Sequence, residues 1–449
     1  MLDQTFTTEN FRKIYDRANR RGLNLEARFF PALAGLTDDI RTLTGQVREL
    51  RRENHRRDDP GVRGQIAALL ANRDALKAQK NEAIDAELEL LAATVRSDSF
   101  DVTLRQAIGP GAKAIYPAED VPGNFFVLKQ LQENLKRLYG VKQANRHHIV
   151  CQVRDSIDNG FKWTLVRTDI SSFYESIDRQ RLLSKITSDQ LLSVPSKRQI
   201  QRILQEYHRL SGAAVGLPRG VGVSAYLSEL FMRELDAKLR GLKGGVLYAR
   251  YVDDIVVLFS RTLTDEHAAY EGLVRAAIEE YGLTPNPLKT HAYNIDHSGA
   301  LSFEYLGYRF DVAGKRCAVH VGSTRLTRYR KRLELCFAEF ARRKPLEPKA
   351  ARNLLVARVK FLTGNLRLHN SKRHALTGIF YNNSAISDTS SLQGLDAYKS
   401  HLAAQTGIPS LQARLADFSF VRGFEERRFQ TFSPKALNRI VKVWQHEAA

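Results

Sequence analysis

Cysteine is scarce in this chain, and its few cysteines form no pattern. Among 449 residues only Cys151, Cys317 and Cys336 occur, far apart and without a CxxC pair. An odd number of distant cysteines argues against a disulfide framework and against a structural zinc site. We therefore expect a reducing, cytoplasmic location.

Long apolar runs are also absent. The N-terminal stretch MLDQTFTTENFRKIYDRANRRG has no apolar segment behind its charges, so we do not expect a signal peptide. No run of about 18 apolar residues occurs, so we expect no membrane span and no membrane partner. Internal repeats and low-complexity tracts are lacking too. Hydrophobic residues nevertheless make up 43% of the chain, which is enough for a folded core.

Acidic residues are outnumbered by basic ones. Lys and Arg number 69 against 49 Asp and Glu, which gives a net charge of +20. Backbone phosphates favour such an excess, so a nucleic-acid partner is the first interpretation. A merely basic surface, or attraction to anionic lipid, is the alternative.

The N-terminal hundred residues predict a helical region. Aromatic residues within positions 1–36 favour a small helical cap, and apolar residues then recur at spacings of three, four and seven. The run DDPG at 58–61 separates two helices, which predicts a helical hairpin or short coiled coil. This hairpin either packs against the body of the protein or contacts a partner. The apolar residues are Ile40, Leu43, Val47 and Leu50 in the first helix, and Leu69, Leu76, Ala83 and Leu90 in the second, which ends near Val95.

Short apolar runs alternate with helical stretches over residues 163–312. The order strand, helix, helix, strand, strand, helix, strand predicts a split βαβ sheet with helices on one face. Residues 320–449 are basic and predict mostly helix. The expected strands are 164–170, 246–251, 255–259 and 292–295, and the expected helices are 179–186, 223–239 and 265–281.

Two adjacent acids interrupt an apolar region in LYARYVDDIVVLFS, residues 247–260. Neighbouring side chains of a continuous strand point to opposite faces, so Asp253 and Asp254 are better explained by a hairpin turn at a sheet edge. Two such close acids resist joint ionisation unless cations neutralise them. A solubilising turn is the plainer alternative.

A third acid ends another apolar strand in WTLVRTDISSFYESID, residues 163–178. If Asp169 lies beside the hairpin, the three carboxylates form a cluster suited to two Mg²⁺ ions roughly 3.5–4 Å apart. Magnesium prefers carboxylate and phosphate oxygens, and Mn²⁺ is the expected substitute. One ion would activate an attacking 3′-hydroxyl, and the other would stabilise the leaving pyrophosphate.

These motifs resemble the boxes of reverse transcriptases. Tyr251-Val252-Asp253-Asp254 matches their YxDD box, and Asp169 with Phe173 and Tyr174 resembles their first catalytic box. Three further segments follow the family order: GLPRG at 216–220, TPNPLKT at 284–290 and FEYLGY at 303–308. The resemblance implies an α+β fold of the right-hand polymerase type, with fingers, a split βαβ palm sheet and a helical thumb, plus the N-terminal helical hairpin.

The resemblance also implies a division of the chain and roles for single residues. It implies an N-terminal helical region at 1–100, fingers at 101–162 with part of 180–215, a palm at 163–312, and a basic thumb and C-terminal region at 313–449. The stretch 358–372 suggests a nucleic-acid face, and Phe380 and Tyr381 either stack on bases or pack. The implied metal ligands are Asp169, Asp253 and Asp254, with the Ile170 carbonyl. The implied nucleotide-binding residues are Tyr174 (as a gate against the 2′-hydroxyl), Arg219, Gly220, Lys289, Arg146 and Lys162. The implied primer grip is Tyr305, Leu306 and Gly307.

Within the family, the chain lacks the VTG box of retron polymerases and any HNH-like nuclease pattern. Its first 22 residues, its helical hairpin and RVKFLTGNLRLHNSKRHALTGIFYNN resemble bacterial defence-associated reverse transcriptases, namely the smaller polymerase subunit of type 3 systems. This implies RNA-templated DNA synthesis from dNTPs in antiphage defence, a noncoding RNA template, a second reverse transcriptase subunit and a larger assembly. The alternatives are a template-independent nucleotide polymerase, a retron or intron-like enzyme, and an RNA-binding scaffold without activity.

Overall fold

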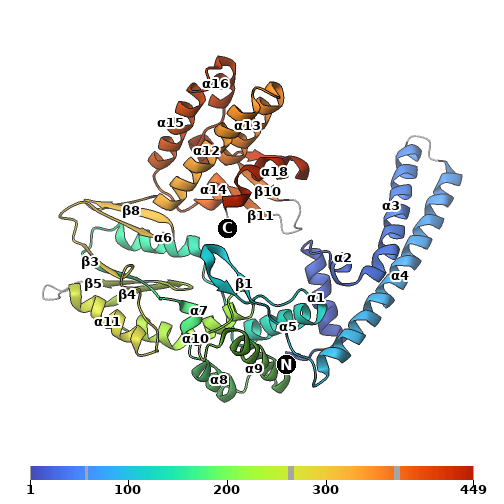
Figure 1. Ribbon diagram of the computed structural model, residues 1–449, viewed down its shortest axis with the longest axis horizontal. Helices are drawn as coiled ribbons and strands as arrows, with labels where there is room; N and C mark the ends of the chain where they lie inside the picture. The colour runs from blue at the N-terminus through green and yellow to red at the C-terminus, as the bar shows by residue number, and fades with distance from the viewer. Residues whose placement is uncertain (1, 56–58, 261–266, 369–374, 448–449) are drawn as a thin grey trace. The chain divides into compact units, whose positions relative to one another are not determined.

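The computed structural model describes residues 2–55, 59–260, 267–368 and 375–447, which divide into two compact units (Figure 1). The first unit comprises Met1–Ala107, Ala114–Val141 and Asp178–Leu230. The second comprises Ile108–Lys113, Lys142–Ile177 and Phe231–Ala449. Both helices and sheets are present, so the prediction of an α+β fold is confirmed.

The first unit begins with the predicted helical hairpin. Figure 1 shows α3 (Ala34–Asn54) beside the long α4 (Pro60–Arg96). The Asp59 carboxylate caps α4, and Pro60 occupies its first turn, where a missing N–H costs nothing. The face predicted for α4 is wrong at Leu90, which is 68% exposed. The helix instead buries Ile84, Leu88, Ala92 and Val95, because α1 (Thr8–Arg20) and α5 (Pro122–Leu138) pack on that side.

Aromatic side chains join the N-terminal cap to α5. The ring centroids of Phe11 and Phe126 are 5.2 Å apart, and those of Phe29 and Phe125 are 5.4 Å apart. The other elements that contribute to this unit are α2 (Leu25–Phe29), η1 (Pro31–Leu33), β2 (Ala114–Ile115), α8 (Arg179–Ser188), α9 (Val194–Ser211) and the first part of α10 (Ser224–Arg240). The short β1 (Ala107–Ile108) has one residue in each unit, and η2 (Pro110–Ala112) belongs to the second unit.

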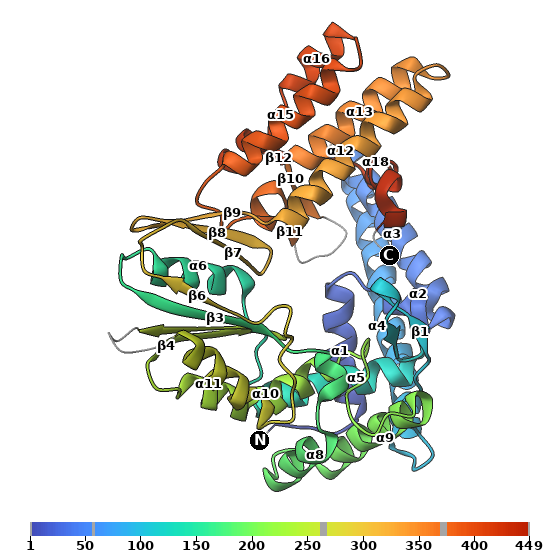
Figure 2. The same cartoon turned by 60° about the vertical axis from the view of Figure 1, so that its left-hand side comes forward.

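A four-stranded antiparallel sheet forms the centre of the second unit, in the order β4-β5-β3-β6. The predicted strands are all present, as β3 (Trp163–Asp169), β4 (Gly245–Tyr251), β5 (Asp254–Ser260) and β6 (His291–Ile295). Helices cover both faces rather than the one face predicted. Helix α11 (His267–Glu279) packs on β3 and β6, whereas α6 (Arg146–Ile157) packs on β4 from the other side (Figures 1 and 2). Five consecutive residues of β5, 255–259, are therefore buried.

A second antiparallel sheet, β7-β8-β9, lies on the far side of α6 in both views. Its strands are β7 (Leu301–Tyr305), β8 (Tyr308–Ala313) and β9 (Arg316–Val321). Phe303 and Phe310 stack with centroids 4.9 Å apart and join the core that contains Val150 of α6 and Val256 of β5. One hydrophobic core thus fixes the two sheets against each other.

Residues after β9 are mostly helical, as predicted, with one small sheet, β11-β10-β12. Two residues of the expected nucleic-acid face at 358–372 cannot contribute to it, because Arg358 is only 3% exposed and Asn365 is fully buried. For the other described residues of this stretch, up to 368, the face stays a prediction, and 369–372 lie outside the described residues. No helix in the described parts of the chain has the length and apolarity needed to cross a membrane. Helix α7 (Phe173–Ser176) follows β3 in the second unit. The elements after β9 are α12 (Ser323–Arg343), α13 (Pro348–Thr363), β10 (Asn365–Leu368), β11 (Ala375–Gly378), α14 (Ile379–Asn382), α15 (Ser390–Ala404), α16 (Pro409–Ala416), α17 (Phe420–Glu425), β12 (Phe429–Gln430), α18 (Pro434–Val441) and η3 (Lys442–Glu447).

Candidate active site

The acidic pair lies at a tight hairpin, as predicted. Strand β4 ends at Tyr251 and β5 begins at Asp254, and these two residues pair across a turn made by Val252 and Asp253. Val252 has a φ of 60°. A β-branched residue rarely adopts a positive φ, so surrounding contacts must hold this turn.

A buried ion pair supplies one of these contacts. The Arg250 guanidinium donates to the Val252 carbonyl at 2.9 Å and to both oxygens of Asp236 at 2.8 and 2.9 Å. The Tyr248 hydroxyl donates to the same carboxylate at 2.6 Å. Burial, and then the charge of Asp236, raises the pKa of Tyr248 well above its ordinary value. The turn therefore rests on a hydrogen-bonded network that the sequence motifs did not indicate.

Asp169 ends β3 directly opposite Asp254 in the β3–β5 register. The Ile170 N–H donates to the Asp253 carbonyl at 3.2 Å, which ties the end of β3 to the turn. The structure thus brings Asp169, Asp253 and Asp254 to one edge of the sheet, although Asp169 and Asp253 are 84 positions apart in the sequence. Antiparallel pairing of the two apolar strands is sufficient to produce this arrangement.

Two cationic side chains face the acids. The Lys289 ammonium lies 3.0 Å from the Asp169 carboxylate, and Arg167 lies 3.4 Å from that of Asp254. Burial raises the pKa of Asp253, and repulsion from Asp169 and Asp254 adds to the shift. Burial also raises the pKa of Asp254, against the opposing effect of Arg167. The two cationic side chains therefore only partly stabilise the negative charge of the three carboxylates.

The donor atoms of this edge are hard oxygens, which suit Mg²⁺ or Mn²⁺ better than softer metals. Within the residues that the structure describes, however, no three side chains of His, Cys, Asp or Glu converge closely enough to hold a metal ion as they stand. The Asp169 carboxylate is instead bound by Lys289 and, at 3.3 Å, by the Asn286 amide. The chemistry of the donors fits a divalent cation, and metal binding would require these side chains to rearrange.

The segment TPNPLKT reaches the end of β3 through its backbone. The Asn286 N–H donates to the Asp169 carbonyl at 2.7 Å, and the Ser171 N–H donates to the Thr284 carbonyl at 2.9 Å. This pairing delivers Lys289, whose side chain is half exposed, to the acids. Lys289 was predicted for this place, whereas Asn286 was not singled out.

The β7–β8 turn is built by Leu306 and Gly307, both with positive φ, at 49° and 68°. This geometry is that of a type I′ hairpin. Tyr305, 1% exposed, directs its hydroxyl to the Asp254 carbonyl at 3.5 Å. Arg167 donates to the Glu304 carbonyl as well as to Asp254. The turn predicted to grip a primer is thereby linked to the acidic cluster. Arg167 was missed, although a lone arginine inside the apolar run TLVRTD was a visible signal.

The remaining predicted residues are more dispersed. Tyr174 lies in α7, five residues after Asp169, and its ring packs on Phe173 at 5.3 Å. Arg146 donates to the Leu306 carbonyl, at the β7–β8 turn. Lys162, which was predicted to bind the nucleotide, lies away from the acids. It is exposed and precedes β3, so the whole strand of seven residues, about 20 Å, separates it from Asp169.

Arg219 and Gly220 belong to the first compact unit, so their predicted contact with a nucleotide stays a prediction. Within that unit the Arg219 carbonyl accepts from the Tyr116 N–H at 2.7 Å. Gly220 has a φ of 99°, and a Cβ there would lie 3.4 Å from the backbone nitrogen of Pro117. Glycine is therefore required by the local backbone, whatever binds nearby.

A family model described as "Reverse transcriptase (RNA-dependent DNA polymerase)" matches residues 126–310. The match is shorter than half of the chain and includes all three clustered aspartates. The protein therefore contains a segment, residues 126–310, that is similar to the reverse transcriptase domain. Polymerases of this family generally use divalent metal ions.

Among solved structures, telomerases are similar to this chain at low identity. Telomerase from Candida albicans in complex with a TWJ fragment of telomeric RNA has 13% identity and a TM-score of 0.35, over 79% of this chain and 63% of that one. Apo telomerase from Candida tropicalis truncated from its C-terminal domain has 13% identity and a TM-score of 0.36, over 51% of this chain and 56% of that one. The chain thus spans less than two thirds of these two proteins. No curated protein matches it significantly.

Proposed function

We propose that this protein is an RNA-directed DNA polymerase that extends a 3′-hydroxyl with deoxynucleotides, using Asp169, Asp253 and Asp254. The observation that carries the proposal is the β3–β5 register, in which Asp169 faces Asp254 beside the Val252–Asp253 turn. Acids with a purely structural role gain nothing from this arrangement, since burial, and then repulsion from Asp169 and Asp254, raises the pKa of Asp253. A carboxylate cluster that is costly to charge is typical of a functional site.

The side chains around the cluster support this chemistry. Bound Mg²⁺ or Mn²⁺ would stabilise the charge that develops on the attacking hydroxyl and on the departing pyrophosphate. Lys289 lies at the Asp169 carboxylate and is half exposed, so its ammonium is available to neutralise or protonate pyrophosphate. Tyr174, in the helix that follows Asp169, is proposed to contact the sugar and exclude a 2′-hydroxyl.

We further propose that the template is a bound noncoding RNA and that the enzyme is a bacterial antiphage polymerase with a second reverse transcriptase subunit. The likeness of the N-terminal segment, the helical hairpin and residues 358–383 to defence-associated enzymes supports this narrower assignment. The net charge of +20 favours an RNA partner. The three cysteines form no disulfide, which is consistent with the proposed cytoplasmic location.

Extension of a DNA primer on a defined RNA template, with purified full-length protein, tests the polymerase proposal. Asp253→Asn keeps the size of the side chain and removes its charge, so we expect synthesis to fall below detection while RNA binding is nearly unchanged. Asp417→Asn, an exposed acid that follows α16, is the matched control and should retain full activity. Undiminished synthesis by Asp253→Asn would refute the assigned site. Product of unrelated sequence, made equally well without the RNA, would instead establish template-independent synthesis.

Sequencing of nucleic acid that co-purifies with the protein from its native host tests the narrower assignment. The expected result is one enriched noncoding RNA together with DNA complementary to part of it. A population of unrelated cellular RNAs, without complementary DNA, would contradict the proposed template.

A further inference from the structure

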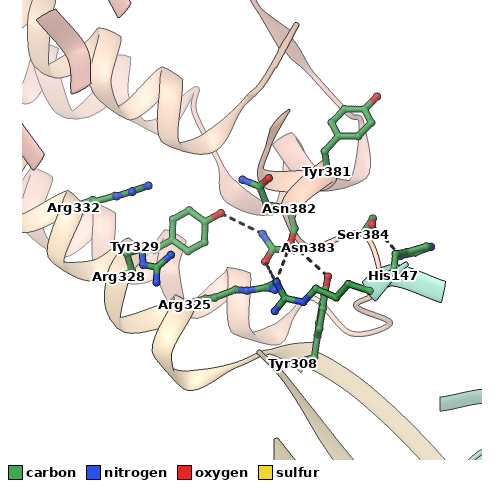
Figure 3. Close-up of a pocket in the computed structure, with 11 residues that line it drawn as sticks. His147, Tyr308, Arg325, Arg328, Tyr329, Arg332, Tyr381, Asn382, Asn383 and Ser384 are labelled. Atoms are coloured by element: carbon green, nitrogen blue, oxygen red, sulfur yellow. Dashed lines mark hydrogen bonds between the residues drawn. The ribbon is translucent and has the colours of Figure 1, made fainter. Parts of the chain in front are cut away.

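A cavity of about 440 Å³ lies where α6, the start of β8, α12 and the end of α14 meet (Figure 3). Its volume is in the range of small-molecule binding pockets. Four arginines line it, Arg146, Arg325, Arg328 and Arg332, and none of its lining residues is Asp or Glu. The lining of the cavity therefore concentrates positive charge and includes no acidic side chain.

Two of these arginines are held close together. Arg146 and Arg325 both donate to the Leu306 carbonyl, and both guanidinium groups lie over the Tyr308 ring, with centroid distances of 5.7 and 4.6 Å. Burial and repulsion from Arg325 lower the pKa of Arg146. The Arg146 Nε atom is buried and has no hydrogen-bond partner among the described residues. A buried charged donor without an acceptor is costly, unless a ligand supplies one.

The wall of the cavity is rigidly built. Arg325 donates to the Asn382 carbonyl at 2.9 Å and to the Asn383 side-chain oxygen at 3.1 Å. The Asn383 amide donates to the Tyr329 hydroxyl at 3.2 Å (Figure 3). These bonds fix the guanidinium group of Arg325 before any ligand arrives, which lowers the entropic cost of binding.

We propose that this pocket binds the 5′-phosphate chain of a nucleotide. Guanidinium groups pair with phosphate oxygens through two parallel hydrogen bonds, and arginine is favoured wherever phosphate is recognised. An internal phosphodiester carries a single negative charge, whereas even one terminal phosphate carries up to about two at neutral pH. The positive charge of four arginines matches a terminal phosphate chain better than an internal phosphodiester. The rings of His147 and Tyr381, which also line the cavity, offer surfaces on which a base can stack.

The ligand has two sources with the same chemistry: a free nucleoside triphosphate, or the 5′-terminal nucleotide of a strand. The pocket is distinct from the acidic cluster, because Asp169, Asp253 and Asp254 are not among its lining residues. The two sites nevertheless share the β7–β8 hairpin, since Tyr305 reaches Asp254 and Tyr308 forms part of the pocket. The proposal does not depend on polymerase activity, because binding can be measured without it.

Calorimetric titration of the full-length protein with inorganic tripolyphosphate tests the site. Arg328→Gln removes one exposed guanidinium of the pocket, and we expect about a tenfold weaker affinity, the lower end for a charge-assisted contact. The control is Arg330→Gln on the same helix, whose guanidinium lies over Tyr398 instead. This control should bind like the wild type. Thermal unfolding of each variant establishes that it is folded.

The two sources are separated with GTP and with one RNA oligonucleotide carrying either a 5′-triphosphate or a 5′-hydroxyl. Arg328-dependent binding of GTP supports a free nucleotide, and an Arg328-dependent preference for the 5′-triphosphate strand supports a strand end. The proposal is overturned if tripolyphosphate does not bind, or if Arg328→Gln binds it as tightly as the wild type does. Equal, Arg328-dependent affinity for the two oligonucleotides overturns it as well, because the pocket would then recognise internal backbone phosphates.

Discussion

Removal of the Asp236 carboxylate tests how the Val252–Asp253 turn is held. In Asp236→Ala, the Arg250 side chain, only 6% exposed, loses both of its carboxylate hydrogen bonds, and the Tyr248 hydroxyl loses its acceptor. Breaking a buried ion pair by deleting one partner costs about 3–5 kcal/mol, because the remaining buried charge loses the opposite charge that stabilised it. We expect the free energy of unfolding to fall by this amount.

The double variant Asp236→Leu/Arg250→Met separates stability from activity. Apolar residues of similar volume often replace a buried ion pair without loss of stability, so the free energy of unfolding should return close to the wild-type value. The Val252 carbonyl, however, loses the donor that Arg250 provides at 2.9 Å. Since a displacement of about 1 Å in a catalytic group can cost about a hundredfold in rate, primer extension should remain at least that much slower.

Urea unfolding followed by circular dichroism, together with single-turnover primer extension, provides both measurements. Tyr248→Phe is the control, because it removes one hydroxyl and leaves the Arg250–Asp236 pair intact. A loss below about 1 kcal/mol in Asp236→Ala would be the size expected of an exposed pair and would refute the buried network. Full activity in the stable double variant would refute the role of Arg250 in holding the turn.

Two further outcomes follow from the second unit. Tyr174→Ala should raise ribonucleotide incorporation by about tenfold or more relative to deoxynucleotides, since a steric difference of one small group between two substrates changes their relative rates to this extent. Unchanged sugar selectivity in competition assays would reject the proposed gate. Burial raises the pKa of Cys317 and of Cys336 to about 12, so both thiols should resist a thiol reagent at pH 8 in the native protein, whereas the partly exposed Cys151 should react. Peptide mass spectrometry, with guanidinium-unfolded protein as the control, measures this difference, and rapid labelling of all three in the native state would contradict it.

The elements around the acids could be predicted because local patterns determine them. Apolar β-rich runs end at Asp169 and flank the 253–254 turn, and antiparallel pairing of such runs leaves few other places for three acids. The hairpin of α3 and α4 was equally visible from its helical spacing and from the break before Pro60. The buried face of α4 could not be predicted, because packing against α1 and α5, rather than the heptad spacing, determines it.

Contacts between distant segments could not be predicted from local pattern. Arg358 and Asn365 read as exposed and polar, yet the fold buries both: the Asn365 amide donates to the Gly423 carbonyl at 2.9 Å and its side-chain oxygen accepts from the Phe380 N–H at 2.9 Å. Lys162, seven positions before Asp169, was expected to contact the triphosphate because of the resemblance to the fingers of the family. A strand converts that short sequence distance into a long spatial one.

Most of the contacts that the sequence did not reveal are made by arginine side chains, and one physical reason accounts for this. A guanidinium group reaches several acceptors that are remote in sequence, so its role depends on tertiary structure rather than on spacing. Arg167 connects Asp254 to the Glu304 carbonyl, Arg250 connects Asp236 to the Val252 carbonyl, and Arg325 connects Leu306 to Asn383. The first two support a cluster of negative charge, whereas Arg325, among the residues that the structure describes, donates to neutral acceptors only and lies beside Arg146. Because of that difference, the arginines of the second site need an external anion as their partner, whereas those of the first site already pair with carboxylates of the chain.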